Sequence, residues 1–567
     1  MTAGDCPPIR PEAEESRRGL LRQGLLIAGL ALVLNFVGNG RVGLWDRDEP
    51  RYAESVREMR ARGDWMVPQF NGEPRYHKPI FIYWVMGLGT AIGGDNPFGA
   101  RLGSALAGTA ACLVVWWLGR RMLGATPAFI GTIALVTSPI WVTESKLATT
   151  DATLAFLLVV AQACLWELGK RASTRVALAF WAALALACLT KGPVGPALIA
   201  TAGLASWWFG GPTACWSRLR WRWGLALFAA ITLPWFVMIG ISSNGDFYRF
   251  AVGQQVIQRL QTGMEDHGGF PGYYLALSIV TFYPWSALVP AAVVGAWTRR
   301  KASPAFGFLL GWVVGPLILL ELVKTKLIHY YLPAFPAMAL LVGWLVTAVS
   351  LDVMSIRRWT LGRLALGLLA GLGVATTAGL VAGAFILPSE LRSPCLSLAA
   401  LLIAGTLVAT ADFHRGQPIL ATRKLAASWA VFMIAFSGWF LPLAEPHRLS
   451  RVVGEKLARL AEVEGAKPVL VTFQEPGVIY AMRRNAPTMR SWDEIDRQLT
   501  YNRAIVTAAT PPQVVSLSRD GRFVVDVLES IDGFNVNKGQ VQPIRLVRIT
   551  ASASSIAVRS VEQPKVK

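Results

Sequence analysis

Ionisable side chains are concentrated in one short segment that follows the first long apolar run of the chain. Seven of them lie within nine residues: Asp46, Arg47, Asp48, Glu49, Arg51, Tyr52 and Glu54. Such a cluster must face water or a polar cavity, because charge inside a membrane is costly unless it is solvated, paired or used. A carboxylate placed there can act as a general base, and nearby cations can stabilise a phosphate. The segment is therefore the first candidate for chemistry.

The composition indicates a membrane protein. The chain has 567 residues, of which 53% are hydrophobic and only 16% are charged, whereas a soluble protein carries about a quarter charged residues. Apolar stretches long enough to cross a bilayer recur from Leu20 to Leu443. The net charge of +20 fits basic residues that anchor cytoplasmic loops better than it fits binding to nucleic acid. The six cysteines show neither a pairing pattern nor a CxxC spacing, so we expect no disulfide and no cysteine metal site.

Basic clusters between the apolar stretches set the expected topology. If each cluster is cytoplasmic, an even number of spans separates neighbouring clusters, and the short run 79–93 becomes a re-entrant or interfacial helix. We expect about thirteen transmembrane helices, a cytoplasmic N-terminus and a C-terminal domain outside. The expected spans are 20–38, 98–119, 126–143, 151–169, 175–190, 193–210, 223–241, 273–297, 304–323, 330–349, 362–387, 395–412 and 425–443.

The composition changes after Pro442. Residues 468–473, 504–508 and 523–528 are rich in strand-forming residues, and 451–463, 477–484 and 492–499 have helical patterns. The expected organisation is thus an all-α membrane protein with a small extracytoplasmic α/β domain. Its parts are a cytoplasmic tail at 1–19, a transmembrane region at 20–443 with a first outer loop at 39–97, the α/β domain at 444–550 and a flexible tail at 551–567.

A helix over 48–62 would position the charged segment. Asp48 suits its N-cap, and Arg60 and Arg62 suit its C-terminal end. Asp48, Arg51 and Tyr52 then share one face. Two interpretations remain open: Asp48 caps the helix and pairs with Arg51, or it works as a base or orients an acceptor while Arg51 and Tyr52 bind phosphate or sugar.

Further candidates lie at the expected outer ends of other spans. Lys78 precedes an aromatic stretch that includes Tyr83, a setting that suits a lipid phosphate or an ordinary interfacial lysine. Asp151 begins a span, so it is either a second working carboxylate or an N-cap. Lys191 lies at a helix break before Gly192 and Pro193. A last basic patch runs from Lys324 to Tyr331. Carboxylates and cations on one membrane face suit a reaction on an anionic, lipid-linked substrate.

Several motifs together resemble a known family. WDRDEPRYAE, RYHKP, FGARLGS, TTDATLAF, LTKGP and KTKLIHYYLPAFPA occur in this order between about residues 20 and 345. They look like the aminoarabinose lipid A transferases and related polyprenyl-phosphate-dependent glycosyltransferases. The resemblance implies a C-type glycosyltransferase fold and transfer of a sugar from undecaprenyl phosphate at the outer face of the plasma membrane.

The resemblance also implies roles for single residues. Asp48 and Asp151 match the two loop aspartates of the family, and Lys78 matches the lysine that contacts the carrier phosphate. The other matching positions are Arg51, Tyr52, His267, Tyr330 and Tyr331. The aminoarabinose enzymes carry Glu where this chain has His77. A divalent metal shared by His77 and His267 is the less favoured alternative, and no other cofactor is implied.

The expected activity is therefore an inverting glycosyl transfer to an envelope acceptor such as lipid A or a related glycolipid. The expected partners are an undecaprenyl-phosphate-linked donor, a lipid or glycan acceptor and membrane lipids. Protein O-mannosyl transfer is the nearest alternative reaction. A lipid or sugar transporter is the alternative of another class, and the concentration of acidic residues in outer loops instead of within spans disfavours it.

Overall fold

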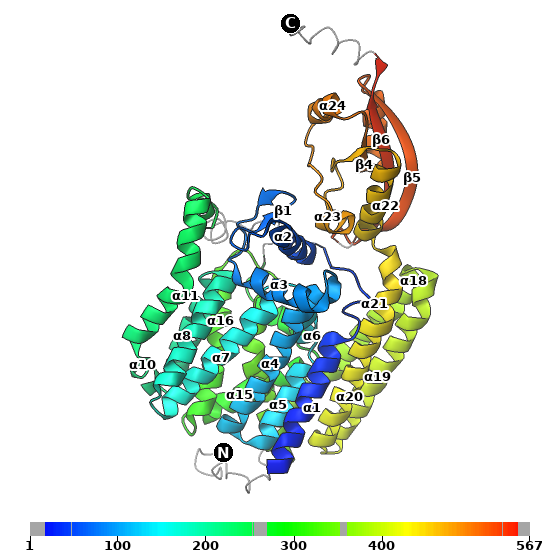
Figure 1. The fold of residues 1–567 in the computed structure, drawn as a ribbon. Helices are drawn as coiled ribbons and strands as arrows, with labels where there is room; N and C mark the ends of the chain where they lie inside the picture. The colour runs from blue at the N-terminus through cyan, green and yellow to red at the C-terminus, as the bar shows by residue number, and fades with distance from the viewer. Residues whose placement is uncertain are drawn as a thin grey trace. The chain divides into compact units, whose positions relative to one another are not determined.

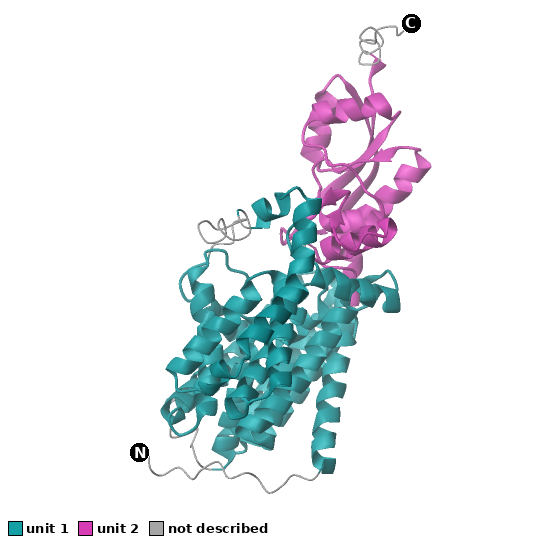
Figure 2. Cartoon of the chain, turned by 60° about the vertical axis from the view of Figure 1, so that its left-hand side comes forward, with its two compact units in different colours: residues 1–41, 76–441 teal, residues 42–75, 442–567 magenta. Residues whose placement is uncertain are grey.

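The computed structural model describes residues 17–46, 48–251, 253, 269–351, 360–535 and 537–553. They form two compact units: residues 1–41 with 76–441, and residues 42–75 with 442–567 (Figure 2). The charged segment that follows the first helix therefore belongs to the same unit as the C-terminal domain. His267 and most residues of the expected tails at 1–19 and 551–567 lie outside the described residues.

The first unit is a bundle of apolar helices that run side by side (Figure 1). Among the described residues, ten helices are long and apolar enough to cross a membrane, or eleven if one bent pair counts as a single span. The chain is a multi-pass membrane protein. The helices of this unit are α1 (Arg17–Phe36), α3 (Phe81–Gly93), α4 (Pro97–Leu123), α5 (Ala125–Val136), α6 (Pro139–Lys146), α7 (Asp151–Lys170), α8 (Thr174–Lys191), α9 (Val194–Trp208), α10 (Ala214–Ser217), α11 (Trp221–Ser242), α12 (Asp246–Tyr248), α14 (Tyr273–Thr281), α15 (Val289–Arg299), α16 (Pro304–Leu322), α17 (Phe335–Ser350), α18 (Thr360–Ile386), α19 (Arg392–His414) and α20 (Pro418–Ala435). The short helix α21 (Leu441–Ala444) begins at the last residue of this unit.

The expected count of thirteen spans is not confirmed. The stretch 126–143 is the bent pair α5 and α6, which are inclined by 61°. The stretch 193–210 holds α9, which has only 15 residues, and 273–297 is divided into α14, a 3-10 turn at Trp285–Leu288 and α15. The short helix expected over 79–93 is present as α3. Apolar runs thus locate the helices, but their continuity depends on local turns that hydropathy does not register.

Glycines allow some of these helices to approach closely. A Cβ on Gly343 of α17 would lie 2.1 Å from the carbonyl oxygen of Pro127 in α5. A Cβ on Gly108 of α4 would lie 2.1 Å from Ser145 Oγ in α6. Contacts of this kind need small residues, as is common between membrane helices. The contact at Gly108 packs α6, which carries Glu144, closely against α4.

The second unit contains α2 (Asp48–Arg62), the two-residue strands β1 (Gln69–Phe70) and β2 (Glu73–Pro74), and the C-terminal domain. That domain has four strands in the order β3-β4-β6-β5, with helices packed against the sheet. Its elements are α22 (Leu449–Val463), β3 (Lys467–Pro468), α23 (Pro476–Met482), α24 (Trp492–Tyr501), β4 (Ile505–Ala509), α25 (Pro511–Arg519), β5 (Phe523–Asn535) and β6 (Gln540–Ala551).

The helices and strands expected in the C-terminal domain are present, but β6 and α25 were not predicted. The strand at 468–473 is shorter than expected, since only Lys467 and Pro468 pair with β4. β6 contains Pro543 and charged residues, which masked it as a strand. Pro543 lies opposite Asp532 of β5, beyond the residues of β6 that pair with β4. A proline is tolerated there because a strand lies on only one side of it.

Hydrogen bonds fasten the segment 42–75 within the second unit. The Arg448 guanidinium donates to the carbonyl oxygen of Gly43 at 2.9 Å, and the backbone N–H of Gly477 donates to Asp46 Oδ1 at 2.6 Å. The Asn71 side chain both donates to and accepts from the backbone of Ala486, at 2.8 Å each. These bonds attach the chain before and after α2 to the C-terminal domain.

Candidate active site

A buried ion pair joins the ends of two neighbouring helices of the first unit. α7 has 20 residues, α8 has 18, and the short connection 171–173 makes them a helical hairpin. Asp151 begins α7 and Lys191 ends α8, so hairpin geometry brings them together. Lys191 Nζ donates to Asp151 Oδ1 at 2.6 Å, and each side chain is only 9% exposed. A carboxylate at a helix N-terminus and a lysine at a C-terminus both complement the helix dipoles.

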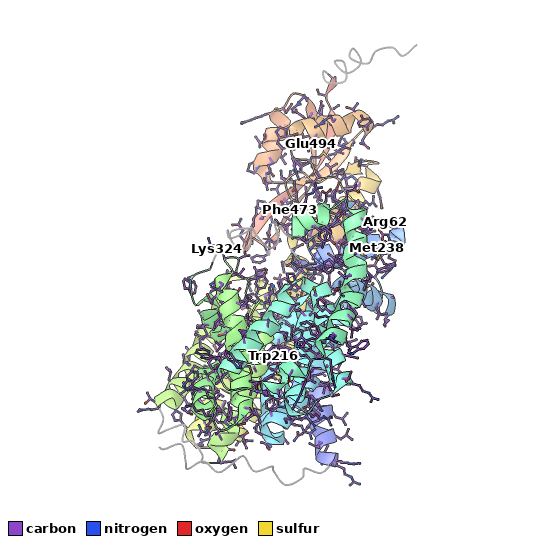
Figure 3. The ribbon with its side chains drawn as sticks, turned by 90° about the vertical axis from the view of Figure 1, so that its left-hand side faces the viewer. Arg62, Trp216, Met238, Lys324, Phe473 and Glu494 are labelled. Carbon is purple, nitrogen blue, oxygen red and sulfur yellow. The ribbon has the colours of Figure 1, made fainter. Side chains whose placement is uncertain are left out.

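Two more predicted residues of this unit lie close to the pair. The Lys191 ammonium lies 4.6 Å from the centre of the Tyr330 ring, a cation–π contact. Lys78 attracts the Asp151 carboxylate electrostatically. Lys324, in the same basic patch as Tyr330, is exposed (Figure 3). The structure thus gathers four of the predicted residues, Asp151, Lys191, Tyr330 and Lys78, into one cationic and aromatic site around a buried carboxylate.

Two residues of this site were not singled out from the sequence. His329 Nε2 lies 3.8 Å from Asp151 Oδ2, and His329 Nδ1 lies 3.8 Å from Glu144 Oε1. Glu144 is buried near the end of α6. Both residues occur inside the segments that carried other candidates, since Glu144 precedes Asp151 and His329 precedes Tyr330. Their approach to each other depends on how the turn that carries His329 packs against α6, which the sequence pattern does not encode.

The remaining candidates of the first unit lie in other surroundings. Tyr331 is buried and its hydroxyl donates to the carbonyl oxygen of Val313 at 2.8 Å, which satisfies it within the fold. Tyr83 is fully buried on α3. His77 is exposed and its ring centre lies 4.7 Å from that of Phe250. His267 lies outside the described residues. Across the part of the chain that is described, no group of three His, Cys, Asp or Glu side chains could hold a metal ion.

The predicted helix over 48–62 is confirmed as α2 of the second unit. Asp48 begins it with a side chain that is 57% exposed, and Arg51 Nη1 lies 3.9 Å from its carboxylate. Tyr52 is buried beneath the Arg75 guanidinium, 5.1 Å from the ring centre. Asp48 therefore presents a solvated carboxylate next to a cation on a helix end that its neighbours hold in place.

The other acids of the charged segment have structural partners. Asp46 accepts hydrogen bonds from Gly477 N–H and the Ser450 side chain, and burial raises the pKa of its carboxyl above the ordinary value. Glu49 is buried and accepts from the backbone N–H of Trp45 at 2.7 Å. The two acids stabilise the turn that leads into α2. Among Asp46, Asp48 and Glu49, the acid that extends into solvent is Asp48.

Comparison with known proteins finds similarity to glycosyltransferases. The family model for dolichyl-phosphate-mannose-protein mannosyltransferase matches residues 25–244. A relative from Edwardsiella ictaluri, an undecaprenyl phosphate-alpha-4-amino-4-deoxy-L-arabinose arabinosyl transferase, is 35% identical over 53% of this chain and 55% of its own length. A protein of the same name from Pectobacterium atrosepticum is 28% identical over 65% of this chain and 67% of its own length. The chain thus spans just over half the length of the first of these relatives.

A solved structure shares the fold of almost the whole chain. The crystal structure of ArnT from Cupriavidus metallidurans bound to undecaprenyl phosphate superposes with a TM-score of 0.76 at 24% identity, and the match covers 95% of this chain and 99% of that one. The all-α membrane fold and the small C-terminal sheet domain expected from the sequence are therefore confirmed.

Proposed function

We infer that this chain is a member of the glycosyltransferase superfamily of the aminoarabinose and protein mannosyl transferases. Its proposed activity is the transfer of a sugar from a polyprenyl-phosphate carrier to an envelope acceptor. The observation that carries this proposal is the buried Asp151–Lys191 pair with Tyr330 and Lys78 close to it. Lysines held near an aromatic ring and a membrane-level carboxylate suit the phosphate and sugar of a lipid-linked donor. The names of the relatives, and the undecaprenyl phosphate bound to the matched ArnT structure, support the same donor class.

The reaction we propose is an inverting displacement at the anomeric carbon. An acceptor oxygen forms a bond to that carbon while the bond between the carbon and the phosphate oxygen breaks, and the polyprenyl phosphate leaves with the bonding electrons. Lys78 and Lys191 stabilise the negative charge that grows on the leaving phosphate. Arg51 and Tyr52 contribute to the binding of sugar or phosphate.

The two aspartates take different roles in this proposal. Asp48, which is exposed, accepts the proton of a hydroxyl acceptor or orients an acceptor that is already anionic. Asp151, which is bound to Lys191, holds that lysine in place as an anionic partner. Tyr83, Tyr331 and His267 remain proposed contributors to the walls of the donor site.

The proposed setting is the periplasmic face of the inner membrane, with a cytoplasmic N-terminus and the domain at 444–550 on the periplasmic side. The proposed acceptor is lipid A or a related glycolipid. Protein O-mannosyl transfer is the second candidate, because the matching family model describes that activity for its members.

Transfer by the purified full-length chain tests the proposal. The substrates are an undecaprenyl-phosphate sugar and either lipid A or an acceptor peptide, and the products are identified by mass spectrometry. We expect a glycosylated lipid and free undecaprenyl phosphate. A glycosylated peptide alone would favour the second candidate, and no transfer from several donor sugars to either acceptor would contradict the function.

Asp48→Asn is the matched variant for this assay. Asn begins a helix as well as Asp does but cannot accept a proton, so we expect turnover to fall by about 10²- to 10⁴-fold with an unchanged unfolding midpoint. Asp46→Asn, two residues away, is the control and should keep wild-type turnover. Equal turnover for Asp48→Asn and wild type would remove Asp48 from the mechanism.

A further inference from the structure

The imidazole of His329 lies between two buried carboxylates. Its two ring nitrogens are each 3.8 Å from a carboxylate oxygen, Nδ1 from Glu144 and Nε2 from Asp151. A neutral imidazole has one N–H, whereas an imidazolium has two. Two anions facing the two nitrogens therefore favour the doubly protonated ring.

Charges of both signs lie around the ring. Glu144 of α6 and Asp151 of α7 bring two negative charges, and Lys191 at the end of α8 brings one positive charge. Lys78 adds attraction to Asp151, and the Tyr330 ring lies edge-on to the imidazole at 5.1 Å. The two carboxylates face the ring nitrogens directly, so a positive His329 lies against Glu144 as Lys191 lies against Asp151, and a cation near a buried carboxylate lowers the cost of its burial.

The two oxygens of Asp151 have different partners. Oδ1 accepts from Lys191, while Oδ2 accepts from Thr150 Oγ at 3.2 Å and faces His329. The carboxylate is thereby fixed in rotation as well as in position. Glu144 is oriented in turn, since Thr149 Oγ donates to its other oxygen at 3.5 Å.

We propose that His329 is a positioning residue for the transfer. Glu144 holds the His329 imidazole as a cation, and this imidazolium fixes Asp151 so that Lys191 is presented to the donor phosphate. This inference rests on the proposed function for its catalytic consequence. Its structural content, a charge-balanced chain Glu144–His329–Asp151–Lys191, stands apart from any activity.

A double-mutant cycle on thermal unfolding tests the chain of charges without a substrate. Glu144→Gln and His329→Gln each remove one partner of this charge pair, so each should lower the unfolding midpoint of the full-length protein in detergent by about 2 °C or more. The double variant restores the balance and should lose clearly less than the sum of the two. Glu390→Gln and His414→Gln change exposed residues and serve as controls. Additive losses would overturn the proposal.

Turnover tests the catalytic part. His329→Gln should lower kcat by about tenfold or more with little change in the KM of the donor, and it should remove one limb of the pH–kcat profile. His329→Lys retains a positive charge and should recover part of the loss. Wild-type kcat and an unchanged pH profile in His329→Gln would overturn the positioning role. If wild type itself transfers no sugar, the proposed function fails, while the thermal cycle still decides whether the charge chain exists.

Discussion

The two ends of α7 carry ion pairs of opposite design. Near its C-terminal end, Arg121 of α4 donates to Glu167 from two nitrogens, Nε to Oε1 at 2.5 Å and Nη2 to Oε2 at 2.7 Å. The Arg121 side chain is 40% exposed. At its first residue, Asp151 meets Lys191 at 2.6 Å with both side chains buried, and the His329 imidazole and the Tyr330 ring lie against them. The first is a bidentate ion pair that joins α4 to α7. In the second pair the lysine donates one hydrogen bond, and further charged and aromatic groups surround it, so we propose the second pair as the site.

Of the changes at the two ends of α7, breaking the Asp151–Lys191 pair should have the largest effect. Lys191→Met removes the cation that we propose to bind the donor phosphate, and Asp151→Asn releases that cation from its place. We expect each to lower kcat by about 10²- to 10³-fold in the transfer assay with purified protein. A loss below tenfold in both would mean that this pair is as structural as the pair at the other end of α7.

The Arg121–Glu167 pair should show the reverse pattern. Glu167→Gln leaves a half-exposed arginine without its anion, so we expect a loss of about 1 to 3 kcal/mol in stability. Turnover per folded molecule should stay at the wild-type value, because this pair lies at the opposite end of α7 from Asp151. Chemical unfolding measures the loss of stability, and the transfer assay measures turnover. A lowered kcat in well-folded Glu167→Gln would contradict a purely structural role for the Arg121–Glu167 pair.

The smallest effect concerns Asp46 in the second unit. Burial raises the pKa of this carboxyl in the folded state, so its contribution to stability is present at low pH and is lost as the pH rises through the folded-state pKa. Asp46→Asn can still accept from Gly477 N–H, and it should flatten this part of the pH–stability profile at a cost below about 1 kcal/mol. Unfolding midpoints of wild type and Asp46→Asn, measured across the acidic pH range, check this prediction. The same pH dependence in both proteins would contradict it.

The sequence predicts the individual parts of the site better than their grouping. Capping residues and charge spacing predict α2 to the residue, and apolar length identifies α7 and α8, whose hairpin brings Asp151 to Lys191. The sequence does not reveal that Glu144 and His329 meet, because this depends on α6 breaking from α5 at a 61° angle and on the turn that carries His329 packing against α6. The expected count of thirteen spans is likewise not confirmed, since ten or eleven helices of the described residues are long and apolar enough to cross a membrane. Strand β6 was missed because Arg545 and Arg548, whose charges are matched by Asp532 and Asp526 across the sheet, resemble a polar loop.

Binding of undecaprenyl phosphate tests the central claim most directly, because it asks which end of α7 receives the donor. Affinity is measured for purified wild type, Lys191→Met and Glu167→Gln in the same detergent. We predict that Lys191→Met raises Kd by about 10- to 100-fold, as expected for loss of a charge-assisted hydrogen bond to phosphate, and that Glu167→Gln leaves Kd unchanged. Equal affinities for wild type and Lys191→Met would contradict the account.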